Sequence, residues 1–198
     1  MSTSATPYTL PVNPADSRSP GWMVMVLVIA TEAMLFAYLL FSYFYLASSA
    51  TGKWPPSGRP ELTLVIPNTL ILLASSGSIW WGERGIRRGS PRRLVLGLCT
   101  TLVLGIVFLS IQGIEYAHKP FRLSTDAYSS VFYTITGLHG THVFVGLLMV
   151  AVTLVRALRG HFSASRHLAV SNTAMYWHFV DAVWLVVFTS LYVSPYFT

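Results

Sequence analysis

Five long apolar runs follow one another along the chain, each reaching the ~20 residues that a helix needs to cross about 30 Å of hydrocarbon. Their approximate bounds are 21–46, 62–81, 94–113, 128–156 and 173–194. Short connections rich in Gly, Pro and charge separate the runs. The runs do not alternate with a period of two, which excludes a transmembrane β-barrel. The pattern therefore predicts an all-α integral membrane bundle of five transmembrane helices, in a single domain over 21–198.

The segment before the first run, residues 1–20, is polar, and we expect it to form a flexible cytoplasmic tail. The run over 21–46 is too long for a signal peptide, whose apolar stretch is ~7–15 residues, so we interpret it as an uncleaved helix. Composition agrees with a membrane protein, because 53% of the residues are hydrophobic and 10% are charged. A soluble domain carries about 25% charged residues, so the soluble and disordered classes are set aside.

The 13 basic residues are distributed unevenly between the two sides of the predicted bundle. One side carries Arg18, Arg84, Arg87, Arg88, Arg92, Arg93, Arg156, Arg159 and Arg166. The other side carries Lys53, Arg59, Lys119 and Arg122. Because basic residues stay on the cytoplasmic side, the asymmetry predicts a cytoplasmic N-terminus and a C-terminus outside. The net charge of +6 is then a basic collar facing anionic lipid, and it does not indicate a nucleic-acid partner.

Ionisable side chains inside predicted spans are costly, which makes them the first candidates for function. These candidates are Glu32, His139, His142, His178 and Asp181. The rise of a helix places Glu32, His142 and Asp181 near one layer, close to the middle of the membrane. Surrounded by apolar residues, Glu32 is expected either to stay neutral or to have a specific partner.

Several roles are open for this group. His142 and His178 could bind haem or a metal ion from facing helices, although a depth mismatch of one to two turns argues against a shared ligand pair. A carboxylate–histidine network could instead handle protons or fix helix packing, and each histidine could simply form a hydrogen bond with a neighbouring helix. A free-standing proton carrier using Glu32 and Asp181 is a further alternative, but five helices without an internal repeat are sparse for one.

Two further predictions concern the edges and the packing of the bundle. Glu115 comes just after the third run and has Lys119 four residues on, so we interpret it as an ion-paired surface residue. Small residues that let helices approach closely are predicted to mark packing contacts. They are the segment 74–78 and the pairs Thr136/Gly140 and Gly137/Thr141.

Specific strings occur in a recognisable order along the chain. They are Thr31–Phe36 (TEAMLF), Trp54-Pro55-Pro56, Asn68–Ser76 (NTLILLASS), Gln112 with Glu115-Tyr116, Ala127–Tyr133 (AYSSVFY), Thr136–Val143 (TGLHGTHV) and Tyr176–Trp184 (YWHFVDAVW). Together they resemble successive segments of cytochrome c oxidase subunit III over roughly 21–192. The similarity is to the short bacterial form with five helices, whereas longer members have two more helices before the one that bears the Glu.

The resemblance implies an accessory, non-redox subunit of a haem–copper terminal oxidase, the proton-pumping complex that reduces oxygen in aerobic respiration. It implies that partner subunits bind the haem and copper, and that this chain holds no catalytic residue, cofactor or metal. The chain would pack against the catalytic subunit I and other oxidase subunits, hold structural phospholipid and sustain proton uptake. Its expected location is the bacterial inner (plasma) membrane, as a multi-pass protein.

Residue by residue, Glu32 matches the buried carboxylate of the family. His139, His142, His178 and Asp181 match its polar motif positions, for which we expect interhelical hydrogen bonding, packing or lipid-headgroup roles. The closest alternatives are the same subunit in a quinol oxidase or in a complex associated with nitric oxide reductase.

Overall fold

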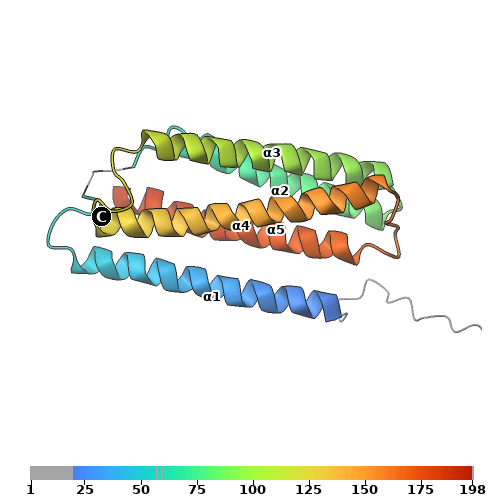
Figure 1. The fold of residues 1–198 in the computed structure, drawn as a ribbon, viewed down its shortest axis with the longest axis horizontal. Helices are drawn as coiled ribbons and strands as arrows, with labels where there is room; N and C mark the ends of the chain where they lie inside the picture. The colour runs from blue at the N-terminus through green and yellow to red at the C-terminus, as the bar shows by residue number, and fades with distance from the viewer. Residues whose placement is uncertain (1–19, 57, 59, 198) are drawn as a thin grey trace, which may run out of the picture.

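The computed structural model of the chain describes residues 20–56, 58 and 60–197, and it consists of long helices joined by short loops (Figure 1). The helices are α1 (Pro20–Ser49), α2 (Val65–Arg87), α3 (Pro91–His118), α4 (Ala127–Leu158) and α5 (Leu168–Phe188). α5 continues through a π-helical turn, η1 (Thr189–Val193), into a 3-10 turn, η2 (Ser194–Tyr196). The described residues contain no strand, so the all-α prediction is confirmed. The predicted tail, apart from Pro20, lies outside them.

The helices extend beyond the apolar runs because local backbone signals decide where they end. Gly89 and Gly160 have positive φ angles of 75° and 73°, and they follow the ends of α2 and α4. Glycine adopts this conformation without steric cost and so terminates a helix. At the start of α4, the Asp126 carboxylate accepts a hydrogen bond from the Ser129 backbone N–H at 2.7 Å. Hydropathy alone does not register these signals.

Four of the helices are long and apolar enough to cross a membrane: α1, α3, α4, and α5 with its continuation to Tyr196. α2 falls short by composition, because Pro67, Asn68 and the serines within 75–78 lower its hydropathy. The chain is therefore a membrane protein with several apolar helices.

Successive helices run antiparallel, so that the start of α1 and the α2–α3 and α4–α5 connections lie together (Figure 1). This end of the bundle, the basic end, carries Arg84, Arg87, Arg88, Arg92, Arg93, Arg156, Arg159 and Arg166. α1 lies at the edge of the bundle against α4 and α5, and its buried residues are Phe36 and Tyr43. The other four helices form the core.

Close helix packing centres on Trp177 of α5, which is fully buried. Its ring lies against two glycines, because a Cβ at Gly105 of α3 would be 2.8 Å from the ring and one at Gly146 of α4 would be 2.9 Å from it. The indole Nε1 donates to the Ser75 hydroxyl at 3.0 Å. A glycine also allows α2 and α3 to approach closely, because a Cβ at Gly97 would lie 2.7 Å from the Ser78 carbonyl oxygen.

The predicted small-residue contacts on α4 are confirmed only at Thr136, which is buried and accepts a hydrogen bond from the Tyr116 hydroxyl of α3 at 2.6 Å. A Cβ at Gly140 would have its nearest neighbour at 4.0 Å, and one at Gly137 would have none within 4 Å. Both glycines are half-buried but leave room for a Cβ, and the close approach on α4 is at Gly146 instead. Spacing identified small residues correctly but did not determine which side of the helix meets a neighbour.

Candidate intramembrane polar site

Glu32 of α1 and His142 of α4 form a direct pair, with the His142 Nε2 at 2.8 Å from a Glu32 carboxylate oxygen. The other ring nitrogen of His142, Nδ1, lies 2.7 Å from the Leu138 carbonyl oxygen. Phe36 packs edge-on against the imidazole, with the ring centroids 5.1 Å apart. Glu32 therefore has the specific partner that its apolar surroundings demand.

The hydrogen bonds constrain how protons are arranged in this pair. A carbonyl oxygen only accepts, so the His142 Nδ1 must carry a proton and donate it. The Nε2 then either accepts from a protonated Glu32 or donates, as imidazolium, to an ionised Glu32. One proton is shared in both cases, and the pair as a whole is neutral. That neutrality makes the pair tolerable at membrane depth, where an isolated charge is costly.

His139 is one turn before His142 but does not join this pair. Its side chain is 1% exposed, and neither ring nitrogen has a hydrogen-bond partner among the described residues. The imidazole packs on Trp184 at 4.9 Å between ring centroids and on Phe108 at 6.1 Å. His139 is thus part of the aromatic core between α3, α4 and α5.

His178 and Asp181 lie in a second cluster, between α5 and α2. The His178 Nδ1 is 2.6 Å from the Ser76 hydroxyl of α2. Asp181 is 4% exposed, and neither of its carboxylate oxygens has a hydrogen-bond partner of good geometry within the described chain. Ser76 is the polar side chain that approaches it.

The layer predicted for Glu32, His142 and Asp181 is therefore divided between two faces of the bundle. Glu32 and His142 meet at the α1–α4 contact, whereas Asp181 lies with His178 at the α2–α5 contact. Depth along a helix follows from sequence, but the direction in which a side chain points depends on the neighbouring helix. No group of three His, Cys, Asp or Glu side chains that could hold a metal ion occurs in the described ranges.

The prediction that Glu115 is a surface residue is wrong, although its predicted pairing with Lys119 is confirmed at 2.8 Å. Glu115 is 7% exposed, and its carboxylate also accepts from Gln112 at 3.0 Å and from Tyr192 at 3.1 Å. The Lys119 ammonium lies over the rings of Phe132 and Tyr192. Tyr192 of η1 and Phe132 of α4 cover the pair, and no local pattern in the chain indicates these contacts.

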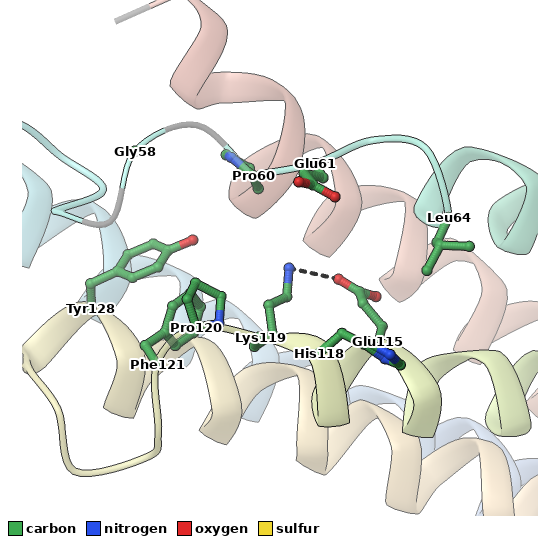
Figure 2. A pocket seen from close by; sticks show the side chains of 10 residues that line it. All are labelled: Gly58, Pro60, Glu61, Leu64, Glu115, His118, Lys119, Pro120, Phe121 and Tyr128. Atoms are coloured by element: carbon green, nitrogen blue, oxygen red, sulfur yellow. Dashed lines mark ion pairs between the residues drawn. The ribbon is translucent and has the colours of Figure 1, made fainter.

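The Glu115–Lys119 pair faces a pocket of about 210 Å³ at the end of the bundle opposite the basic end (Figure 2). The α1–α2 connection forms one side of the pocket through Pro60, Glu61 and neighbouring residues. The sequence does contain one signal for this polar cluster, because polar residues recur on one helix face at positions 112, 115 and 119. Tyr192, 77 residues from Glu115, is too distant in the chain for such a signal to include it.

These features define a multi-pass helical membrane subunit in which buried polar groups join the helices to one another. The chain belongs to the cytochrome c oxidase subunit III family, whose model matches residues 19–196. It is 38% identical over 175 residues to cytochrome c oxidase subunit 3 of Sus scrofa, covering 85% of this chain and 67% of that protein. The corresponding proteins of Prototheca wickerhamii and Myxine glutinosa are each 37% identical with the same coverage.

The role of the chain is accordingly that of subunit III in a haem–copper oxidase, and the predicted family is confirmed. It is part of the oxidase complex, and no catalytic site is found among its described residues. The subunit III family carries no redox cofactor of its own. The quinol-oxidase, nitric-oxide-reductase and free-carrier alternatives are not favoured.

Proposed function

We propose that this chain is a five-span accessory subunit that packs against the catalytic subunit I and sustains its proton uptake. The Glu32–His142 pair carries the proposal, because it joins α1 to α4 through one shared proton. A neutral pair of this kind is suited to holding a helix in place within hydrocarbon. In this proposal the partner subunits bind haem and copper, and the intramembrane polar residues link helices.

The proposed topology has residues 21–198 as one transmembrane domain and 1–20 as a cytoplasmic tail. α2 is included as a span because its polar side chains face its neighbours. The Ser78 hydroxyl is 2.7 Å from that of Thr101 on α3, and the Asn68 amide donates to the Phe108 carbonyl at 3.2 Å. The basic end supports a cytoplasmic N-terminus. A bacterial plasma membrane is proposed from the resemblance of the sequence to the short five-helix form, whereas the similar proteins found are mostly mitochondrial.

We further propose that a structural phospholipid binds at the α4–α5 connection. A groove of about 600 Å³ there is lined by Arg156, His161, Phe162 and Arg166, among others. The Arg156 guanidinium lies over the Phe162 ring at 5.1 Å, which keeps it beside the groove. Two arginines at the membrane boundary fit a phosphate group. Arg156→Gln is expected to release about one phospholipid per complex, as measured by phosphorus content, whereas Arg159→Gln, outside the groove, is expected to release none.

The role of Glu32 is tested by comparing two variants in the purified oxidase. Glu32→Ala removes the hydrogen bond between α1 and α4. The free energy of one interhelical hydrogen bond corresponds to about a three- to tenfold change in the rate of inactivation. We expect unchanged haem content and initial oxygen consumption, with inactivation during turnover faster by that factor. Glu32→Gln still donates from its amide to His142, so its inactivation should stay near that of the unmodified oxidase.

The outcomes separate the possible roles. Inactivation of Glu32→Gln as fast as that of Glu32→Ala would show that the proton matters more than the link. Loss of initial turnover with haem retained would contradict a supporting role. If a tagged chain, extracted in mild detergent, did not bring down a haem-bearing subunit, the proposed packing against subunit I would be wrong.

A further inference from the structure

His178 presents an unpaired nitrogen on the outside of the α2–α5 contact. Its Nδ1 is engaged by Ser76 at 2.6 Å. Its Nε2 has no hydrogen-bond partner in the described part of the chain, and this atom is not fully buried. The imidazole therefore has one nitrogen tied into the bundle and one directed to its surface.

This nitrogen lies at a depth that lipid headgroups do not reach. α5 and its continuation run from Leu168 to Tyr196, and His178 comes ten residues after the start. At 1.5 Å per residue, that is about 15 Å along the helix. Ser76 is the central residue of α2, which runs from Val65 to Arg87. An unpaired polar atom at such a position is costly against hydrocarbon.

The surface around His178 is low in relief and mostly apolar, and the carboxylate of Glu83 on α2 is the charged group that acts on the imidazole. Gly77 of α2 is exposed, a Cβ added there would meet nothing within 4 Å, and Ala182, one turn after His178, is also exposed. Leu73 and Leu185 are 39% and 40% exposed. Small residues beside a polar side chain are typical of contacts between transmembrane helices, because they let the backbones approach closely.

We infer the direction of hydrogen bonding at this surface from Asp181, the carboxyl group that Ser76 approaches. Buried without a partner of good geometry, its carboxyl group is favoured in the neutral, protonated form. It can then donate towards the Ser76 hydroxyl, and Ser76 can donate to the His178 Nδ1. This tautomer leaves an N–H on Nε2, so the group that pairs with His178 from outside must be an acceptor.

We propose that the α2–α5 face around His178 docks a transmembrane helix of another oxidase subunit, which places a hydrogen-bond acceptor against the Nε2. The inference rests on the proposed packing of this chain within the oxidase and assigns one face to it. A lipid tail offers no acceptor at this depth. A protein helix offers a carbonyl freed at a Gly or Pro, or a Ser, Thr, Asn or Gln oxygen.

Photo-crosslinking in the intact complex tests the occupant of this face. A benzoylphenylalanine placed at Ala182 leaves His178 itself unchanged. We expect the crosslinked product to contain a transmembrane peptide of another oxidase subunit. Adducts with lipid alone, or with a second copy of this chain, would overturn the proposal. The tagged chain must bring down the haem-bearing subunit in the same preparation, so failure of this face is distinguishable from failure of the proposed function.

A second measurement tests the hydrogen bond. His178→Phe is expected to make the chain dissociate from the purified complex about three- to tenfold faster in detergent than Ser76→Ala, which loses only the internal bond to Nδ1. That factor is the range for one interhelical hydrogen bond. The matched control is Thr100→Leu, at an exposed hydroxyl nine residues into α3 that already donates to the Leu96 carbonyl of its own helix. The control should dissociate at the unmodified rate. Equal rates for His178→Phe and Ser76→Ala would overturn the assignment of an acceptor to Nε2.

Discussion

Replacing one member of the buried Glu115–Lys119 pair is expected to destabilise the chain far more than replacing both members together. The two side chains are 8% and 10% exposed, so each single replacement leaves an uncompensated charge away from water. Breaking a buried pair in this way costs about 3–5 kcal/mol. Glu115→Gln leaves the Lys119 ammonium without its carboxylate, and Lys119→Met leaves the carboxylate with Gln112 and Tyr192 as its remaining donors.

The double variant removes both charges and keeps side chains of similar volume. Replacing a buried pair by residues of similar shape is often close to neutral, so the double variant should be more stable than either single one. The coupling energy between the two positions should then be at least ~3 kcal/mol, at the upper end of values for residues in contact.

The assay is thermal dissociation of the oxidase carrying a fluorescently tagged chain, followed by size-exclusion chromatography after heating. At about 2–4 °C per kcal/mol for a chain of this size, each single variant should lose about 6–20 °C. The double variant should recover most of that loss. If the double variant lost as much as the two single losses combined, the pair would not be coupled, and the reasoning from burial would be refuted.

Two further predictions address packing. Gly105→Val places atoms within 3 Å of the Leu147 and Trp177 side chains, which should cost about 1–3 kcal/mol of stability and reduce recovery of the complex. The control is Gly140→Ala, where the added Cβ has its nearest neighbour at 4.0 Å, and this variant should be recovered normally. Equal recovery of the two would contradict the packing described at Gly105. Trp184→Phe removes the indole N–H that donates to Thr69 at 3.0 Å, and a loss of about 0.5–1.5 kcal/mol is expected in the same thermal assay. No change there would mean that this hydrogen bond adds nothing to stability.

The sequence correctly predicted those features that depend on a single helix. The length of each apolar run is tied to hydrocarbon thickness, so the existence and order of the helices followed from it. The depth of Glu32 and His142 followed from helix rise, and the two do meet. Asp181 lies at a comparable predicted depth but faces α2, because rotation about the helix axis is set by packing with neighbours. The prediction for Glu115 was wrong for the same reason, since Tyr192 of η1 covers it from a distant part of the chain.

The 110 residues that separate Glu32 from His142 have a consequence for synthesis of the protein in the membrane. A ribosome adding about 5–20 residues per second needs roughly 5–20 s to deliver the partner after α1 has emerged. During that interval α1 has neither α4 nor α5 to lie against, and Glu32 faces lipid or the insertion machinery without its histidine. The first helix made thus waits for the fourth before it can dock, and Glu32 has no partner until His142 arrives.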